Sequence, residues 1–182
     1  MLNEIDLEND MSSPYFVINK ETCHQFESDM KSIGAEVEGT YGAWSFYCKG
    51  VILEEPKSEV SMEKSTYSED DYSMFDSVFN FSDWTIKSQN LNFTAKIRKS
   101  NIWDHLGLSS YKKIHKDLDY RYKCEGDNGS FFNSILGSIQ LLMAKECLYY
   151  FKIENGVLNL KFEADQTFIS EFKDLRKLIK EG

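Results

Sequence analysis

Several features that mark common protein classes are missing from this chain of 182 residues. No stretch approaches about 18 consecutive apolar residues, so the sequence predicts no transmembrane helix. The first ten residues, MLNEIDLEND, lack the basic region and the apolar region of a secretory signal peptide. We therefore expect a cytoplasmic protein. Only 2 prolines occur, Pro14 and Pro56, and each lies near an expected element boundary.

Motifs that bind metals or form disulfides are also missing. The 4 cysteines, Cys23, Cys48, Cys124 and Cys147, are widely separated and form no C-x-x-C pair. In a cytosolic chain of this size such cysteines behave as small buried hydrophobic residues. The sequence therefore predicts no disulfide framework, no metal site and no cofactor.

Histidine is scarce, which limits the catalytic sites that the chain can build. Glu21, His24 and Glu27 are spaced to share one helix, but the second histidine of an H-E-x-x-H zinc motif is absent. His105 and His115 have no partner at a known spacing. We expect all three histidines to lie at the surface or at helix ends, and we assign no catalytic residue.

A glycine-containing turn, GDNGS at residues 126–130, joins an expected strand to an expected helix. Exposed amides at a helix N-terminus can hold phosphate. However, the chain has neither a G-x-G-x-x-G spacing nor the lysine of a P-loop here, and Asp127 would repel an anion. A simple turn, with Asn128 or Ser130 as the helix N-cap, is the better interpretation.

What the sequence does have is an uneven distribution of charge. Residues 1–90 contain 6 Lys/Arg and 18 Asp/Glu, whereas residues 91–182 contain 15 and 12, and the whole chain carries a formal charge of -9. An acidic protein is poorly suited to bind nucleic acid, because phosphate binding needs a cationic surface. The same acidity suits a protein that meets a basic partner.

The first expected structural unit covers residues 14–53 and follows a flexible lead-in over residues 1–13. Tyr15–Ile18 is predicted to form a short strand, and Asn19 to cap a helix that ends near Gly34. The strands expected after this helix include Val37, Trp44–Cys48 and Val51–Leu53.

Residues 54–72, EEPKSEVSMEKSTYSEDDY, contain few apolar residues and many Ser and Glu. This composition predicts a mobile acidic linker or loop. We expect its carboxylates to form an interaction surface. They are Glu54, Glu55, Glu59, Glu63, Glu69, Asp70 and Asp71.

The second expected unit covers residues 73–182 and is more regular. Alternation of apolar and polar residues predicts strands over 91–98 and 117–124, and residues 131–145 are predicted to form a helix. Asn155-Gly156 lies between two alternating runs, which indicates a hairpin with a type I′ turn. A last helix, capped by Asp165, is expected to close the chain.

Together these elements predict an α+β fold, with an antiparallel sheet and helices packed mainly on one face. The strand–helix–strand–strand order at 15–53 and 118–162 fits either one compact domain or two related β-α-β-β units. The exposed sheet face is expected to carry a basic set, interleaved with Asp117, Asp119, Glu154 and Glu163. This basic set is Lys96, Arg98, Arg121, Lys123, Lys152 and Lys161. It is either a docking surface or a solvated face of cross-strand charge pairs, and the interleaved signs favour the pairs.

One long stretch shows a layout seen elsewhere. DYRYKCEGDNGSFFNSILGSIQLLMAKECLYYFKIENGVLNLKFEAD runs from a strand through a turn and a helix into a hairpin, and FDSVFNFSDWTIKSQNLNFTAKIRKSNIWDHLGL precedes it. Residues 75–180 thereby resemble an uncharacterised bacterial domain that is usually attached to membrane-spanning segments. This chain lacks such segments, and the resemblance implies no catalytic residues.

These observations favour a non-enzymatic bacterial binding protein, immunity-like or inhibitor-like, that meets a basic protein partner through its acidic surface. Two alternatives stay open: an enzyme whose polar residues converge only in three dimensions, and a soluble relative of a membrane-anchored domain. A deep pocket that gathers His24 or His115 with carboxylates would favour the enzyme. A flat, acidic surface with aromatic side chains would favour the binding protein.

Overall fold

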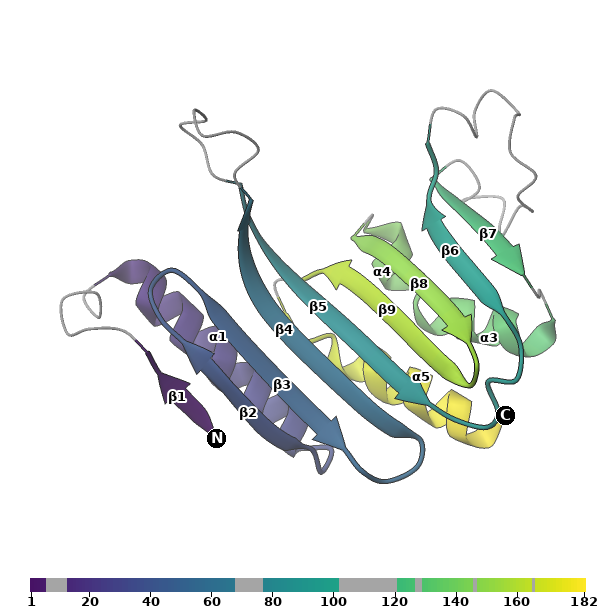
Figure 1. The fold of residues 1–182 in the computed structure, drawn as a ribbon, viewed down its shortest axis with the longest axis horizontal. Coiled ribbons are helices and arrows are strands. Elements are labelled where there is room, and N and C mark those ends of the chain that lie inside the picture. The colour runs from purple at the N-terminus through teal and green to yellow at the C-terminus, as the bar shows by residue number, and fades with distance from the viewer. Residues whose placement is uncertain (6–12, 68–76, 102–120, 127–128, 146, 165) are drawn as a thin grey trace.

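In the computed structural model of this chain, nine strands form one sheet in the order β1-β2-β3-β4-β5-β9-β8-β6-β7 (Figure 1). The structure describes all residues except 6–12, 68–76, 102–120, 127–128, 146 and 165. β1 runs parallel to β2, and all other neighbouring strands are antiparallel. The predicted α+β class is confirmed.

The bounds of the elements are as follows. The first five strands are β1 (Leu2–Glu4), β2 (Glu36–Tyr41), β3 (Phe46–Ile52), β4 (Lys57–Tyr67) and β5 (Ser77–Lys87). The other strands are β6 (Ala95–Lys99), β7 (Tyr122–Gly126), β8 (Leu148–Glu154) and β9 (Val157–Glu163). The described helices are α1 (Pro14–Lys31), α3 (Ser130–Ser138), α4 (Gln140–Ala144) and α5 (Ile169–Glu181).

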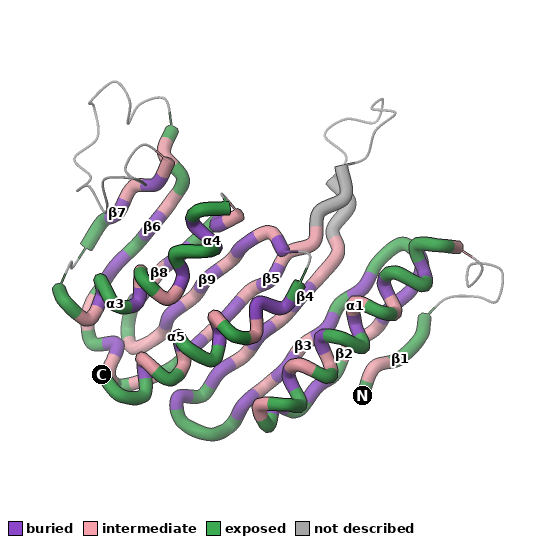
Figure 2. Tube along the Cα trace, turned by 180° about the vertical axis from the view of Figure 1, so that it is seen from behind, coloured by how far each residue is buried: buried purple, intermediate pink, exposed green. Residues whose placement is uncertain are grey.

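The described helices all lie on the same face of the sheet, as Figures 1 and 2 show from opposite sides. The hydrophobic core fills the space between this face and the helices. Trp84 of β5 is fully buried there. Its ring contacts two phenylalanine rings edge-on, with centroid distances of 4.9 Å to Phe162 of β9 and 5.1 Å to Phe172 of α5. This packing fixes α5 above the middle of the sheet.

The first predicted strand, Tyr15–Ile18, is wrong, because these residues belong to α1. The helix begins at Pro14, whose fixed φ suits the first turn, and the Ser13 hydroxyl accepts a hydrogen bond from the Tyr15 amide at 3.3 Å. Asn19 is therefore not the cap. Its buried side chain donates instead to the carbonyl oxygens of Gly42 and Ala43, at 2.7 and 3.1 Å.

The predicted flexible lead-in is wrong at its start, because Leu2–Glu4 forms β1 at the edge of the sheet. Its backbone pairs with Gly39, Thr40 and Tyr41 of β2, and the Met1 ammonium donates to the Val37 carbonyl oxygen. Residues 6–12 of the lead-in lie outside the described residues.

The predicted loop over residues 54–72 is wrong across Lys57–Tyr67, which forms the long strand β4 between β3 and β5. A strand with one covered face needs few apolar residues, and here Val60 and Met62 supply the buried side. Ser58 is also buried and is satisfied by hydrogen bonds to Pro56 and Arg176. The low apolar content of this segment is therefore that of a strand with one solvent-exposed face. Residues 68–72 lie outside the described part.

The hairpin of β8 and β9 is confirmed, with positive φ at both Asn155 (52°) and Gly156 (77°), as a type I′ turn requires. The helix expected over 131–145 is present as two shorter helices, α3 and α4, that meet near Ile139. Gly129 is the N-cap residue of α3, so Ser130, which is the first residue of the helix, is not the cap. The proposed caps Asn128 and Asp165 lie outside the described residues.

The strand–helix–strand–strand order occurs at β1-α1-β2-β3 and again at β7-α3-α4-β8-β9. The pairing differs, however, because β6 lies between β7 and β8, whereas β1 pairs directly with β2. That the two units are related stays a prediction.

Candidate functional site

The face of the sheet opposite the helices, which we call the open face, is not covered by any described element (Figures 1 and 2). Along each strand its residues alternate with the buried core residues, as in Glu59, Ser61 and Glu63 of β4. Cross-strand partners share a face, so the register places Glu38, Lys49, Ser61, Asp83 and Lys161 in one row. The open face is therefore a broad surface of charged, polar and aromatic side chains.

The charges on this face differ between its two halves. The acidic half, on β2 to β5, has five carboxylates and three ammonium groups among its described residues. They are Glu36, Glu38, Glu59, Glu63 and Asp83, with Lys49, Lys57 and Lys87. The basic half, on β9, β8, β6 and β7, has the opposite balance. Its charged residues are Lys96, Arg98, Lys123, Lys152 and Lys161, with Glu125, Glu154 and Glu163.

The predicted acidic set is divided by the fold. Glu59 and Glu63 lie on the open face, where β2 and β5 bring Glu36, Glu38 and Asp83 to the same surface. Glu54 and Glu55 lie in the exposed turn between β3 and β4. Glu69, Asp70 and Asp71 lie outside the described residues. The acidic surface is thus built on strands and not only on a loop.

The predicted basic set shares the open face, apart from Arg121. Lys96 is the cross-strand partner of Lys152, and Arg98 is the partner of Lys123. Lys161 lies opposite Asp83. Arg121 precedes β7, and its guanidinium donates to the Ala144 carbonyl oxygen at 3.2 Å. Asp117 and Asp119 lie outside the described residues.

An ion-pair cluster joins the two halves at the centre of the open face. The Lys161 ammonium lies 3.3 Å from the Asp83 carboxylate and 3.6 Å from that of Glu63. It also lies 5.0 Å from the centroid of the Phe81 ring, which meets Tyr149 edge-on. Burial raises the pKa of Asp83, and the Lys161 ammonium opposes this shift. The pairs are partly exposed, so each contributes about 0–1 kcal/mol.

Large aromatic side chains project from the same face. Tyr47, Tyr149 and Tyr150 are 41%, 42% and 36% exposed. Tyrosine supplies much of the binding energy in protein interfaces, because it buries a large ring while its hydroxyl group can still form hydrogen bonds. The open face thus combines charge with exposed aromatic area.

A cavity of about 750 Å³ lies at one end of the sheet, where the β3–β4 turn, the β5–β6 connection and the β8–β9 turn meet. Lys57 and Lys87 line it, together with amide and hydroxyl side chains from Gln89, Asn92 and Thr94. Leu91, Phe93 and Val157 supply its apolar wall. This cavity could not be predicted from the sequence, because Lys57 and Lys87 become neighbours only when residues 57–67 form a strand beside β5.

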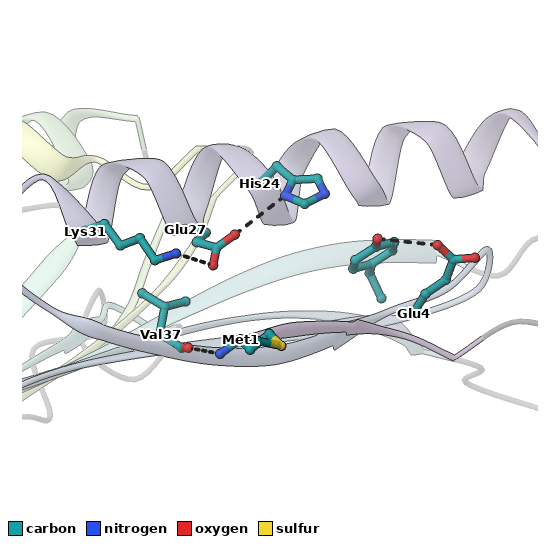
Figure 3. A network of polar contacts seen from close by, with 7 residues as sticks. Met1, Glu4, His24, Glu27, Lys31 and Val37 are labelled. Atoms are coloured by element: carbon teal, nitrogen blue, oxygen red, sulfur yellow. Dashed lines mark hydrogen bonds and ion pairs between the residues drawn. The ribbon is translucent and has the colours of Figure 1, made fainter.

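His24 lies at the surface of α1, away from this cavity. Its ring is 3.6 Å from the Glu27 carboxylate, which also binds the Lys31 ammonium at 2.7 Å (Figure 3). The Lys31 hydrogen bond lowers the pKa of Glu27 below its ordinary value, so this carboxylate is ionised at neutral pH. Glu27 and Lys31 thus form a surface ion pair along the helix, and His24 lies beside it. His105 and His115 lie outside the described residues.

The predicted burial of the cysteines is confirmed for three of the four. Cys23, Cys48 and Cys124 are buried, Cys147 is half-buried, and all four are free. The contact with Cys23 and burial both raise the pKa of Cys48, which keeps its thiol protonated. Within the described part of the chain, no group of three or more His, Cys, Asp and Glu side chains is placed to hold a metal ion.

A scan against protein-family models, a search of curated proteins and a search of solved structures found no match to this chain. The resemblance of residues 75–180 to a bacterial domain therefore stays a prediction. Among the described helices, none has both the length and the apolar character needed to cross a lipid bilayer.

Proposed function

We propose that this chain is a protein-binding module that docks a basic protein on the acidic half of its open face. The observation that carries the proposal is the arrangement of five carboxylates on β2 to β5 on a sheet face that no described element covers. Glu36 and Glu38 are exposed and form no ion pair with any described residue, so they are available to a cationic partner.

The exposed aromatic residues support the same proposal. Tyr47 lies opposite both Thr40 and Glu63, within the acidic half. An aromatic side chain among carboxylates can pack against the stem of a lysine or arginine while the carboxylates bind its charge. Complementary charge of this kind mainly raises the association rate and sets which partners are accepted.

An immunity-like or inhibitor-like role in a bacterial cytoplasm is the setting we propose for this surface. In such a pair a small acidic protein covers a cationic surface of its target, and the net charge of -9 favours this encounter. The proposal requires the partner to be cationic where it meets β2 to β5.

Photo-cross-linking tests the proposal. A cross-linking amino acid placed at Glu38 should capture a basic protein from cells that express the chain. The matched control is the same amino acid at Asp174, an exposed carboxylate on the helical side. Capture from both positions, or capture of an acidic protein from Glu38, would contradict the proposal.

Once purified, the partner should associate more slowly as salt is added, because salt screens exposed charges over about 8–10 Å at physiological ionic strength. Glu36→Gln and Glu38→Gln should slow association further, whereas Asp174→Asn should leave it unchanged. An association rate that is indifferent to salt and to both glutamate substitutions would mean that the acidic half does not guide binding.

A further inference from the structure

The cavity at the end of the sheet contains a pair of like charges that the fold itself brings together. Lys57 of β4 and Lys87 of β5 are direct cross-strand partners, and both are exposed. Like charges in this position destabilise a sheet. The arrangement therefore costs stability unless something negative lies between the two ammonium groups.

Three other lysines of the open face form ion pairs with carboxylates. Lys49 binds Glu59 at 3.0 Å, Lys152 binds Glu154, and Lys161 binds Glu63 and Asp83. Lys57 and Lys87 form no ion pair with any described residue. Glu55 lines the same cavity, and its carboxylate accepts a hydrogen bond from the Lys57 backbone amide at 3.4 Å. The two ammonium groups outnumber this carboxylate, so the charge of the lining side chains is positive.

The walls of the cavity are fixed by hydrogen bonds to α5 and to the neighbouring turn. The Arg176 guanidinium donates to the carbonyl oxygens of Glu54 and Pro56, at 2.9 and 3.1 Å, and so holds the β3–β4 turn. The Asn90 side chain donates to the Ile179 carbonyl oxygen at 2.9 Å. The Ser88 amide donates to the Gly156 carbonyl oxygen at 2.9 Å. The cavity is thus formed before any ligand arrives, which reduces the entropy cost of binding.

We infer that this cavity binds a small organic phosphate. The two ammonium groups would pair with the phosphate, and the side chains of Gln89, Asn92 and Asn155 would supply hydrogen-bond donors around it. Phe93 and Val157 offer apolar contact to the organic part. The volume of about 750 Å³ suits a ligand of this size. This site does not depend on the proposed docking of a basic protein.

Calorimetric titration tests the inference with three probes: phenyl phosphate, inorganic phosphate and phenol. Phenyl phosphate should bind more tightly than inorganic phosphate, and phenol should not bind. Lys57→Gln and Lys87→Gln should each weaken phenyl phosphate binding by about tenfold, because each removes one charge-assisted hydrogen bond.

Lys96→Gln is the matched control, because Lys96 also has a lysine, Lys152, as a cross-strand partner but does not line the cavity. On its other side Lys96 lies opposite Glu125 of β7. The control variant should leave binding unchanged. The inference is overturned if phenyl phosphate does not bind to the full chain, if binding survives in the Lys57→Gln, Lys87→Gln double variant, or if Lys96→Gln weakens it equally.

Thermal melting without ligand gives a second readout that does not use binding. At low salt, Lys57→Gln or Lys87→Gln should raise the melting temperature, since either change removes the repulsion. Lys96→Gln should not raise it. A fall in melting temperature for both cavity variants would show that the two ammonium groups do not repel each other, and would contradict the argument for the site.

Discussion

The helix-covered face and the open face belong to the same strands but differ in what holds their side chains in place. On β9, Leu160 and Phe162 are buried beneath helices, whereas Lys161 and Glu163 alternate with them on the open face. The covered face gains stability from burial of apolar area. The open face is held by partly exposed ion pairs, which contribute little. Substitutions on the open face should therefore cost less stability than substitutions on the covered face.

The largest expected effect comes from truncating a core residue next to an open-face residue. Phe162 packs against Trp84 and Phe168, so Phe162→Ala should lower the free energy of unfolding by about 3–5 kcal/mol. Lys161→Ala, one residue away, should cost about 1 kcal/mol or less. Urea denaturation measures both. Equal losses would break the distinction between the two faces.

The Arg176 side chain is the next test, because it ties α5 on the covered side to the β3–β4 turn at the end of the sheet. It is half-buried, and burial lowers its pKa. Arg176→Met should destabilise by about 1–3 kcal/mol, since it removes the hydrogen bonds that the guanidinium donates to the Glu54 carbonyl oxygen, the Pro56 carbonyl oxygen and the buried Ser58 hydroxyl.

Lys177→Met on the exposed side of α5 is the control for Arg176, and it should change stability by less than about 0.5 kcal/mol. If both variants denature at the same urea concentration, the contact between Arg176 and the turn contributes nothing to stability.

The hairpin turn gives a smaller effect. Gly156 has a φ of 77°, and an added Cβ would lie 3.2 Å from the Ser88 carbonyl oxygen. Gly156→Val should therefore cost about 1 kcal/mol or more, because a β-branched residue resists this conformation. By contrast, Gly137→Ala in α3 has no neighbouring atom within 4 Å and should stabilise by about 0.5–1 kcal/mol. Thermal melting that ranks the two variants in the opposite order would refute the turn geometry.

The smallest expected effect concerns the surface ion pair of Glu27 and Lys31 on α1. Glu27→Gln should destabilise by about 0.3–0.5 kcal/mol at neutral pH. Because the pKa of Glu27 is lowered in the folded state, its contribution is present above the unfolded pKa and is lost as the pH falls through the folded pKa. The difference between wild type and variant should therefore disappear in acid. A constant difference across this range would show that the charge of Glu27 is not what matters.

The fold could be predicted from the sequence where local signals and periodicity agree. The Asn155-Gly156 turn lies between two alternating runs, and the hairpin has the expected register and φ values. The α+β class and the placement of the helices mainly on one face follow from strands with one wet side. At Tyr15–Ile18, four apolar residues fit a strand or a helix, and the Ser13-Pro14 start decides for the helix.

The site could be predicted only in part. The alternation of apolar and charged residues was visible in the sequence, and it indicated which basic residues lie on one face. The five that do lie on the open face are Lys96, Arg98, Lys123, Lys152 and Lys161. The sequence did not predict β4, because Val60 and Met62 are its only buried apolar residues among those described and the composition of the rest is typical of a loop. The acidic half and the Lys57–Lys87 pair both depend on which strands are neighbours in the sheet. Strand pairing joins residues far apart in the chain, so no short stretch of sequence could predict either feature.

Carboxylate footprinting tests the central claim, that the open face is the surface that binds a basic protein. The tagged chain is labelled alone and after recovery with its bound partner from cells, and labelling of each carboxylate is quantified by mass spectrometry. We predict that Glu36, Glu38 and Glu59 on the open face lose labelling in the complex, while Glu21 and Asp174 on the helical side do not. Protection of Glu21 and Asp174, with Glu36 and Glu38 still labelled, would contradict the account.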